Sequence, residues 1–449
     1  MVKAELYPPG PKTRFSATVM LRSVRNPIDL LLDYSKYGDI VHWRFMNDHF
    51  YLLNHPDYIK EALTVQDRNF TKAYALQLAK NALGEGLLTS EGEFHHRQRR
   101  LIQPAFNHQQ IANYATTMVQ YASRTQNGWK DNQTLDIHKE MMRLTLAIVG
   151  KSLFDADLEG EAEVIGRALA EVLEGINRAT LIPLGEYLEK IPTPSNRAYE
   201  QAQKRLDATI YRIIAERRAS GLDHGDLLSM LLQAEEEGGR MTDAQVRDEA
   251  MTLFLAGHET TANALTWTFY LLSQNPESEA KLHEELDRVL QGRVPNFQDV
   301  PKLPYTRMVL TEVMRLYPPA WVLGRAVIKP TRIGGYLLPK GAAVFMSQFV
   351  IHHDPRFYPD PYQFKPERWT PEEEKKLPRF AYFPFSGGPR SCVGEQFAWM
   401  EGILLLATLA QEWRMRLAPG HRVAMLPRIT LRPKYGMQMI LTKRKKENC

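Results

Sequence analysis

The alternation of hydrophobic and polar positions along the chain predicts a mainly helical protein with a smaller β portion near each end. Residues 39–53 are typical of two short strands joined by a polar turn, because Val41, Trp43 and Phe45 alternate with polar neighbours. Residues 58–315 mostly show the spacing of amphipathic helices. Breaks in the helical pattern are expected at segments rich in Gly and Pro, namely 84–92, 183–194 and 238–239.

The C-terminal part of the chain alternates between the two kinds of structure. Residues 326–349 contain several Pro and Gly residues and predict short strands. A helical pattern returns after Cys392, and strand-like runs follow at 429–431 and 437–441. The run of Lys and Arg at 443–446 is expected to be a solvated tail.

The chain contains no segment with the composition of a linker between independent domains. We therefore expect residues 1–449 to form one domain with two lobes. The β-rich lobe is expected at about 1–65 and 320–360, and the helical lobe comprises the remainder. The expected fold class is mainly α with a minor β portion.

The longest predicted helix spans residues 243–274. Thr242 and Gln245 have the spacing of a capping box at its start, and Asn275 followed by Pro ends it. At about 1.5 Å per residue this helix is ~48 Å long, which is enough to cross a domain. Its centre, residues 256–261, is unusual for a core helix because it holds Gly, Thr and an acidic residue.

One face at the centre of this helix has almost no side chains. Thr260 shares that face with Gly257 and Ala256, so a small ligand could approach the backbone beside a hydroxyl group. The alternative is a tolerated Gly and a Thr that hydrogen-bonds to the preceding turn. A metal site at His258 and Glu259 finds no further ligand at i+3 or i+4.

Composition and charge exclude several classes of protein. A content of 44% hydrophobic and 24% charged residues excludes intrinsic disorder for most of the chain. The net charge of +5 is too small to indicate nucleic-acid binding. Two cysteines, Cys392 and Cys449, exclude a disulfide framework and favour a reducing compartment. Because the sequence has no transmembrane run and its N-terminus lacks an apolar signal core, we expect a soluble, cytoplasmic protein.

Cys392 lies between a Gly-rich turn, residues 385–391, and the helical run 396–409. Free N–H groups at a helix N-terminus favour an anion, so the thiol is expected to ionise at neutral pH. One thiolate cannot form a structural zinc site. It can act as a nucleophile if a base lies nearby, or as the single protein ligand of a haem iron.

The residues around Cys392 resemble the haem-ligand loop of the cytochrome P450 family. The pattern Phe-x-x-Gly-x-Arg-x-Cys-x-Gly is met by Phe385, Gly388, Arg390, Cys392 and Gly394. The resemblance covers essentially the whole chain and implies the cytochrome P450 fold, with a helix-rich lobe and a smaller β-rich lobe. The chain looks like a soluble, bacterial-type member.

Further segments resemble motifs of the same family, in the same order. Residues 256–261 look like the oxygen-binding segment of the long central helix. Glu312 and Arg315 look like a buried ion pair, and Arg368 looks like the arginine that completes the network. In this network, removal of one partner would leave an unpaired buried charge.

The resemblance implies haem b as the cofactor, with Cys392 as the axial ligand of the iron. His95, Arg99, Arg325 and Arg390 are expected to bind the haem propionates; many family members have Trp where this chain has His95. Arg325 could equally be a surface arginine. The remaining cofactor-binding residues that the resemblance implies are Phe385, Gly394, Ala256 and Gly257.

The resemblance also implies catalytic and substrate-binding residues. Thr260 and Glu259 look like the acid–alcohol pair, in which a hydroxyl passes protons to the bound oxygen and the acid supplies them. The substrate pocket is expected over the distal haem face, with the 74–88 region as a wall and 173–188 as a mobile lid. The substrate-binding residues expected are Leu253, Phe254, Val322, Leu323 and Met437.

The implied activity is that of a monooxygenase that inserts one atom of O2 into a lipophilic small molecule, by hydroxylation or epoxidation. The chain has neither a dinucleotide fingerprint nor cysteines for an iron–sulfur cluster. Electrons are therefore expected from a separate donor, either a ferredoxin with its reductase or a flavoprotein reductase. Alternatives of the same fold are a peroxide-driven peroxygenase, an oxygen-independent isomerase or dehydratase, and a haem protein without turnover. A cysteine-nucleophile hydrolase is an alternative of another class.

Overall fold

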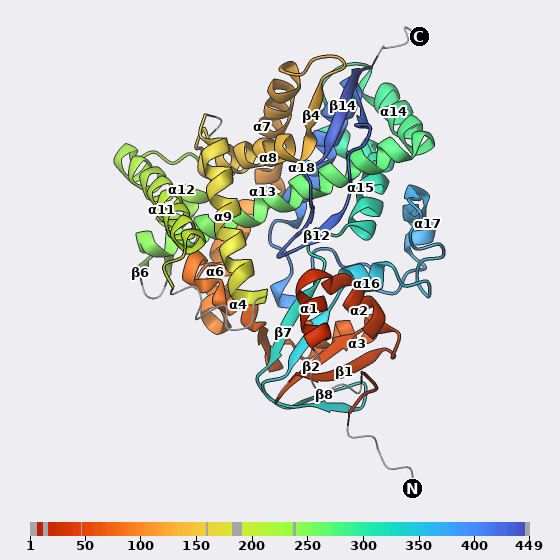
Figure 1. The fold of residues 1–449 in the computed structure, drawn as a ribbon. Coiled ribbons are helices and arrows are strands. Elements are labelled where there is room, and N and C mark those ends of the chain that lie inside the picture. Colours follow the sequence, from red (N-terminus) through yellow and green to blue (C-terminus); the bar gives the residue numbers. More distant parts are fainter. Residues whose placement is uncertain are drawn as a thin grey trace.

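A computed structural model of the chain describes residues 7–11, 17–45, 47–158, 160–181, 191–236 and 239–444. The long predicted helix is present with the predicted bounds: α13 spans Asp243–Gln274 and begins with the capping box between Thr242 and Gln245. Figure 1 shows α13 crossing the helix-rich part of the molecule. Most of its side chains are buried on all sides, which is why its sequence has little amphipathic pattern.

Long helices surround α13 and make the main hydrophobic core with it. Its principal neighbours are α8 (Ile137–Phe154), α11 (Pro194–Ser220), α15 (Pro304–Leu316) and α18 (Glu395–Glu412). The other α-helices within the described residues are α1 (Ala17–Arg25), α2 (Pro27–Ser35), α3 (Pro56–Lys60), α4 (Tyr74–Leu78), α5 (Lys80–Leu83), α6 (Gly92–Ile102), α7 (His108–Asn127), α9 (Ala162–Leu181), α12 (Leu227–Gln233), α14 (Pro276–Leu290), α16 (Gln348–His352) and α17 (Pro371–Glu374).

Several short helical turns connect these elements. Glu61–Val65 forms a π-helical turn directly after α3. The 3-10 turns are Asp67–Asn69, Gln103–Phe106, Phe297–Lys302, Pro366–Trp369 and Gly388–Arg390. The last of these turns lies in the loop that carries Cys392.

A five-stranded mixed sheet lies at the lower end of the molecule in the view of Figure 1. Its strands in spatial order are β1 (Ile40–Phe45), β2 (Asp48–Leu53), β10 (Ala343–Met346), β7 (Leu323–Val327) and β3 (Phe70–Lys72). β2 and β10 pair in parallel, and the other neighbours pair antiparallel. The register places Lys72 of β3 opposite Arg325 of β7, which brings two basic residues to one end of the sheet.

Smaller sheets complete the fold. β11 (Trp413–Leu417), β14 (Gln438–Lys443) and β4 (Thr134–Asp136) form a three-stranded sheet. Two-stranded sheets pair β12 (Met425–Pro427) with β13 (Leu431–Pro433), β5 (Glu235–Glu236) with β6 (Gly239–Arg240), and β8 (Thr331–Ile333) with β9 (Tyr336–Leu338). The mainly α fold class with a minor β portion is confirmed, while the assignment of 1–449 as one domain with two lobes stays a prediction.

The structure changes the interpretation of the C-terminal basic run. Arg444 is not a solvated side chain: its Nη2 lies 2.7 Å from Asp287 Oδ2, and its Nη1 donates to Gln411 O at 3.0 Å. The backbone N–H of Arg444 also donates to Glu412 O, at the end of α18, at 2.8 Å. Lys443 is exposed, and residues 445–446 lie outside the described part of the chain. None of the helices in the described ranges combines the length and hydrophobicity that a bilayer-spanning helix requires.

Candidate functional site

The loop that carries Cys392 is a compact turn whose glycines are required by close contacts. A Cβ atom on Gly388, where φ is +70°, would lie 2.0 Å from Leu63 O, and one on Gly387 would lie 2.4 Å from the Phe380 ring. The N–H of Cys392 donates to Phe385 O at 3.0 Å. Gly394 then begins α18 as its N-cap, so the turn holds the thiol at a helix N-terminus as predicted.

The expectation that this thiol ionises by itself is wrong. Burial raises the pKa of the Cys392 thiol to about 11, although the Gly394 N–H and Arg99 act in the opposite direction. The Cys392 side chain is nevertheless exposed, so its sulfur is accessible to a ligand. In the chain alone the group is therefore a neutral thiol, and a coordinated metal cation would deprotonate it.

A cluster of buried basic side chains lies between the sheet and α6. Burial lowers the pKa of Lys72 to about 8, that of Arg325 to about 10 and that of His95 to about 3. Among the described residues, Glu91 is the carboxylate that pairs with this cluster, at 3.0 Å from Arg390 Nη2. The cluster thus has an excess of positive charge in a setting that disfavours it, and a bound anion would relieve this.

The hydrogen bonds of His95 show which of its nitrogens is free. Nδ1 lies 3.3 Å from Ser90 Oγ and 3.4 Å from Lys72 Nζ. Because an ammonium group only donates, Nδ1 is the acceptor and Nε2 carries the proton. That Nε2, like Arg390 Nε, is buried without a hydrogen-bond partner among the described residues. Two unused N–H donors in a cationic cluster fit the carboxylates of a haem group.

The structure gathers His95, Arg325 and Arg390 in this cluster and places Arg99 beside the cysteine loop. Arg99 Nη1 donates to Ser391 O at 2.6 Å, so it anchors the residue next to Cys392. Sequence reasoning missed Lys72, because its position depends on the pairing of β3 with β7.

Ala256, Gly257 and Thr260 are the accessible positions in the central part of α13. From residue 249 to residue 269 the other side chains of the helix are buried. Thr260 Oγ1 donates to Ala256 O at 2.8 Å, which is the back-bonded arrangement considered as the plain alternative. A Cβ atom on Gly257 would meet Val149 Cγ2 of α8 at 2.9 Å, so this glycine also serves helix packing.

Glu259 faces away from this patch, into a buried polar network. Its Oε1 accepts from Thr430 Oγ1 at 2.5 Å and lies 3.5 Å from Arg432 Nε. Thr430 directly precedes β13, and Arg432 belongs to that strand. Asn263, one turn further along α13, donates to Thr430 Oγ1 at 3.3 Å and lies 3.1 Å from His138 Nε2. The outward link of Glu259 therefore runs through side chains that the sequence did not indicate. His258 Nδ1 donates to Phe254 O at 2.7 Å, and the described residues contain no group of three side chains suited to a metal ion.

The structure brings Glu312, Arg315 and Arg368 together at the end of α15. Both side chains of the Glu312–Arg315 pair are fully buried and form two hydrogen bonds of 2.8 Å. Arg368 Nε lies 3.3 Å from Glu312 Oε1, and Trp369 Nε1 donates to Glu312 Oε2 at 2.9 Å. The carboxylate is thus satisfied on both oxygens by groups from two segments.

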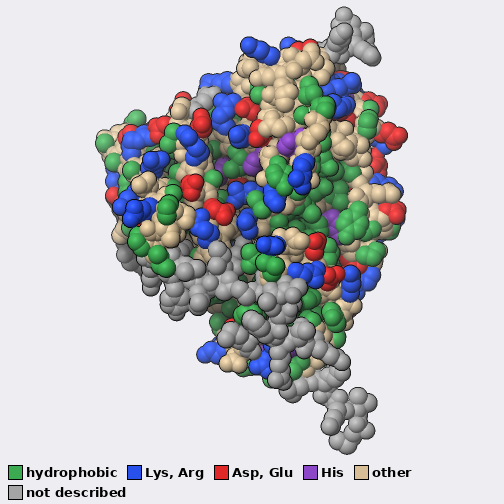
Figure 2. Space-filling view, in the orientation of Figure 1, with side chains coloured by type: hydrophobic (Ala, Val, Ile, Leu, Met, Phe, Trp, Pro, Cys, Tyr) green, Lys and Arg blue, Asp and Glu red, His purple; other side chains and the backbone are tan. Residues whose placement is uncertain are grey.

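The predicted substrate residues are dispersed. Leu253 is buried in α13, and Phe254 stacks on Phe154 of α8 with ring centroids 4.5 Å apart. Met437 is fully buried in the main core, while Val322 and Leu323 are partly exposed. On the face shown in Figure 2, hydrophobic side chains gather in a hollow near the centre of the view, with Lys and Arg side chains around it.

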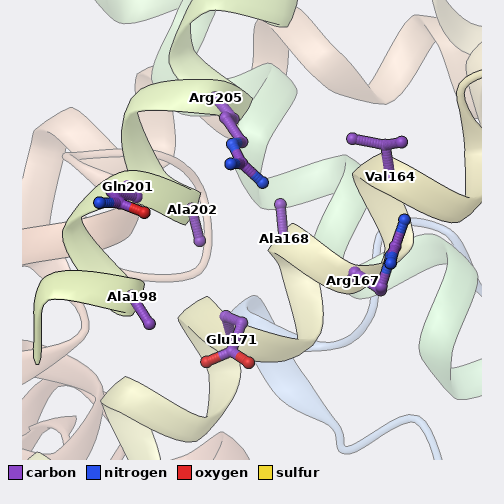
Figure 3. A pocket seen from close by; sticks show the side chains of 8 residues that line it. All are labelled: Val164, Arg167, Ala168, Glu171, Ala198, Gln201, Ala202 and Arg205. Atoms are coloured by element: carbon purple, nitrogen blue, oxygen red, sulfur yellow. The ribbon is translucent and has the colours of Figure 1, made fainter. Parts of the chain in front are cut away.

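Two grooves of the molecular surface contain none of the predicted site residues. One, of about 290 Å³, lies between α9 and α11, and Figure 3 shows Arg167, Glu171 and Arg205 among its lining residues. The other, of about 840 Å³, lies beside α2. Of the predicted lid 173–188, the part to residue 181 belongs to α9, and 182–188 lies outside the described residues.

Comparisons with known proteins find relatives that match most of this chain. Cyclooctatin synthase from Streptomyces melanosporofaciens is 40% identical over 415 residues, which cover 92% of this chain and 90% of that protein. Cyclooctat-9-en-7-ol 5-monooxygenase from the same organism is 40% identical over 399 residues, covering 88% and 86%. Pentalenene oxygenase from Streptomyces avermitilis is 34% identical over 424 residues, covering 94% of each chain.

Structural and family comparisons extend over nearly the whole chain. The crystal structure of the cytochrome P450DA heme domain matches with a TM-score of 0.86 and 26% identity, covering 98% of each chain. The sequence pattern of the family described as cytochrome P450 matches residues 8–441. The chain therefore belongs to the cytochrome P450 family, with the fold of that family, haem b as its cofactor and monooxygenation as its class of reaction.

Proposed function

We propose that this monooxygenase inserts one oxygen atom of O2 into a lipophilic small molecule of the terpenoid class, by hydroxylation or epoxidation. The names of three relatives support this class, since they refer to cyclooctatin, cyclooctat-9-en-7-ol and pentalenene. The hydrophobic hollow in Figure 2 suits such a substrate, because ligand pockets are lined mostly by apolar side chains.

The observation that carries the proposal is the accessible thiol of Cys392 in a loop that close backbone contacts hold in one conformation. Cys392 is the proposed axial ligand of the haem iron, and Arg99 keeps its loop in place through Ser391 O. When bound, the haem supplies the centre that activates oxygen, and a thiolate ligand favours O–O cleavage.

The basic cluster is the proposed site of the haem propionates. His95 Nε2 and Arg390 Nε are buried donors that lack partners in the described part of the chain, and both would donate to a carboxylate. Lys72 and Arg325 contribute positive charge without an ion pair of their own among the described residues. Phe385 and Gly394 belong to the cysteine loop and complete the proposed haem contacts.

Thr260 and Glu259 are the proposed proton-handling pair. The Thr260 hydroxyl is the accessible side-chain donor of the patch on α13, and its back-bond to Ala256 O leaves its lone pairs free to accept a proton. The Thr430 hydroxyl and the Arg432 guanidinium hold the Glu259 carboxylate in its present position. In this proposal Glu259 supplies protons and the Thr260 hydroxyl passes them on.

Electrons come, in this proposal, from a separate ferredoxin with its reductase or from a flavoprotein reductase. A peroxide-driven peroxygenase or an isomerase of the same fold would not need the acid and hydroxyl that this chain retains at 259 and 260. The cytoplasmic location expected from the sequence stays a prediction.

The decisive test is incorporation of isotopically labelled oxygen. The purified protein is supplied with a surrogate ferredoxin system, NAD(P)H and a panel containing cyclooctat-9-en-7-ol, pentalenene and fatty acids. We expect a terpenoid product that contains one atom of labelled O2 and forms only with NAD(P)H. Turnover with hydrogen peroxide alone, or a product without labelled oxygen, would favour the peroxygenase or isomerase instead.

A further inference from the structure

Three consecutive residues of α13 bind the backbone of one short segment, residues 82–90. Arg247 Nη2 donates to Ala82 O at 3.0 Å, Asp248 Oδ2 accepts from the N–H of Glu85 at 2.8 Å, and Glu249 Oε2 accepts from the N–H of Leu87 at 2.8 Å. We call these three residues of α13 the clasp. The clasp binds main-chain groups, so it holds the path of the segment rather than a particular side chain.

Both backbone polar groups of Leu87 are hydrogen-bonded to side chains. Its N–H is bound by Glu249, and its carbonyl accepts from Lys72 Nζ at 2.9 Å. Lys72 Nζ also donates to Ser90 O at 2.6 Å and lies beside His95 Nδ1. The same ammonium group therefore connects the segment to the basic cluster proposed for the haem propionates.

The segment lies directly against α13, next to the accessible patch. A Cβ atom on Gly86 would lie 2.2 Å from Thr252 Oγ1 and 2.5 Å from Asp248 O, so the two backbones are as close as a glycine permits. Thr252 is one helical turn before Ala256 and shares its side of the helix. The segment therefore borders the part of α13 where Ala256, Gly257 and Thr260 are accessible.

The clasp also connects the segment to the neighbouring helix α11. Arg247 Nε donates to Asp207 Oδ1 at 2.8 Å, and Gln203 of α11 donates to Asn81 O at 3.0 Å. Glu249 is fully buried, and burial raises the pKa of its carboxyl to about 8. A buried carboxyl is unfavourable unless it is hydrogen-bonded, and the described contact of Glu249 is the Leu87 N–H.

We propose that Arg247, Asp248 and Glu249 are positioning residues that determine substrate specificity, because they fix the 82–90 segment as a rigid wall beside the reactive patch. The proposal rests on the function proposed above for that site. A rigid wall favours a substrate whose shape matches it, whereas a mobile wall accepts flexible chains as readily as fixed rings.

The test compares Glu249→Leu with Glu249→Gln in the haem-loaded protein. Leu removes the acceptor for the Leu87 N–H, whereas Gln retains a carbonyl oxygen at the same place. We expect hydrogen exchange of the 82–90 amides to accelerate by about tenfold or more in Glu249→Leu, and to stay within about twofold of the parent in Glu249→Gln.

Ligand selectivity is the second readout. Cedrol and farnesol are terpenoid alcohols with equal numbers of carbon atoms, and the first is a rigid ring system while the second is a flexible chain. Their dissociation constants are measured from the shift of the haem absorption band. We expect Glu249→Leu to reduce the ratio of the two constants about fivefold or more towards equal affinity, and Glu249→Gln to preserve the ratio of the parent.

Glu285 provides a matched control. It is a buried carboxylate of α14, outside the clasp. It accepts from the N–H groups of Tyr305 and Thr306, at the start of α15, at 2.7 and 2.8 Å. Glu285→Leu should lower thermal stability without changing exchange at 82–90 or the selectivity ratio. The proposal is wrong if Glu249→Leu leaves exchange at 82–90 unchanged, or if Glu285→Leu accelerates it equally.

The exchange measurement also separates this inference from the proposed function. If neither alcohol binds and no product forms with NAD(P)H, the proposed function fails while exchange still decides whether the clasp holds the segment. If exchange responds but the selectivity ratio does not, the clasp is structural and its role in specificity is refuted.

Discussion

Burial sets the protonation of two single residues, one in the loop before α18 and one within that helix. Cys392 has a pKa near 11, so its role as a ligand depends on the bound cation and not on the helix N-terminus alone. Glu401 of α18 is fully buried, and burial raises the pKa of its carboxyl from an ordinary value of 4.5 to about 8, although the nearby Thr261 acts in the opposite direction.

Glu401 therefore makes stability depend on pH. The folded protein keeps the Glu401 proton between about pH 4.5 and pH 8, where the unfolded chain has lost it, so stability decreases as the pH rises through this window. We expect Glu401→Gln to remove this decrease, with an effect on the order of a few kcal/mol at pH 8 and little effect at pH 4.5. Denaturant unfolding at several pH values measures it, and parallel pH profiles of the two proteins would contradict it.

Thr260 is the residue whose loss should uncouple oxygen activation from product formation. Thr260→Ala removes the accessible hydroxyl of the patch, so we expect a severalfold larger share of NAD(P)H electrons to be released as hydrogen peroxide. Peroxide formed per NAD(P)H consumed is the measurement. Thr266→Ala is the control, since Thr266 makes the same bond to the preceding turn at 2.7 Å but is buried. Equal coupling in the parent and Thr260→Ala would exclude the proton-relay role.

At the scale of elements, the cysteine loop depends on its contact with the π-helical turn Glu61–Val65. Gly388→Ala places a Cβ atom 2.0 Å from Leu63 O and also strains a positive φ. Gly420→Ala isolates the backbone strain, because Gly420 has φ +75° and open space around it. We expect Gly420→Ala to cost about 1–2 kcal/mol of stability and Gly388→Ala at least about 2 kcal/mol more, with loss of bound haem. Chemical denaturation and haem content measure the difference, and equal costs would show that the contact with Leu63 is unimportant.

Elements that depend on residues close together in the sequence were predictable, and features that depend on distant residues were not. The bounds of α13 were predictable because a capping box and an Asn-Pro stop are local signals, and the strands around 40–53 follow from simple alternation. The orientation of the Glu259 side chain was not predictable, because its hydrogen-bond partner Thr430 is 171 positions away in the sequence. The ionisation of Cys392 was predicted wrongly, because the helix N-terminus is visible in the sequence and the burial of the thiol is not.

At the scale of the whole molecule, the proposed haem site is where the β-sheet meets the helices. Arg325 and Lys72 come from adjacent strands, His95 from α6 and Arg390 from the cysteine loop. The resemblance to the cytochrome P450 family implied that His95, Arg325 and Arg390 bind the haem propionates. Lys72 could be recognised as part of this site only from the pairing of β3 with β7. A single lysine in a short strand gives no indication in the sequence that it is buried.

Lys72 should therefore link haem retention to the stability of the whole protein. In Lys72→Met the cluster loses a positive charge and the contact to Leu87 and Ser90, so we expect haem to dissociate on the order of tenfold faster. The rise in melting temperature on haem binding should shrink correspondingly. Lys281→Met is the control, because Lys281 makes an exposed ion pair with Glu367. Unchanged haem dissociation in Lys72→Met would show that this residue does not belong to the proposed propionate site.

The account depends on coordination of the haem iron by the sulfur of Cys392, and the absorption spectrum of the reduced protein with carbon monoxide tests it most directly. We predict a thiolate-type spectrum for the parent and its absence in Cys392→Ser, with activity abolished or severely impaired in that variant. Haem content is measured in both proteins, so that loss of the ligand is separated from loss of the cofactor. A Cys392→Ser variant that binds haem and retains the spectrum of the parent would contradict the assignment.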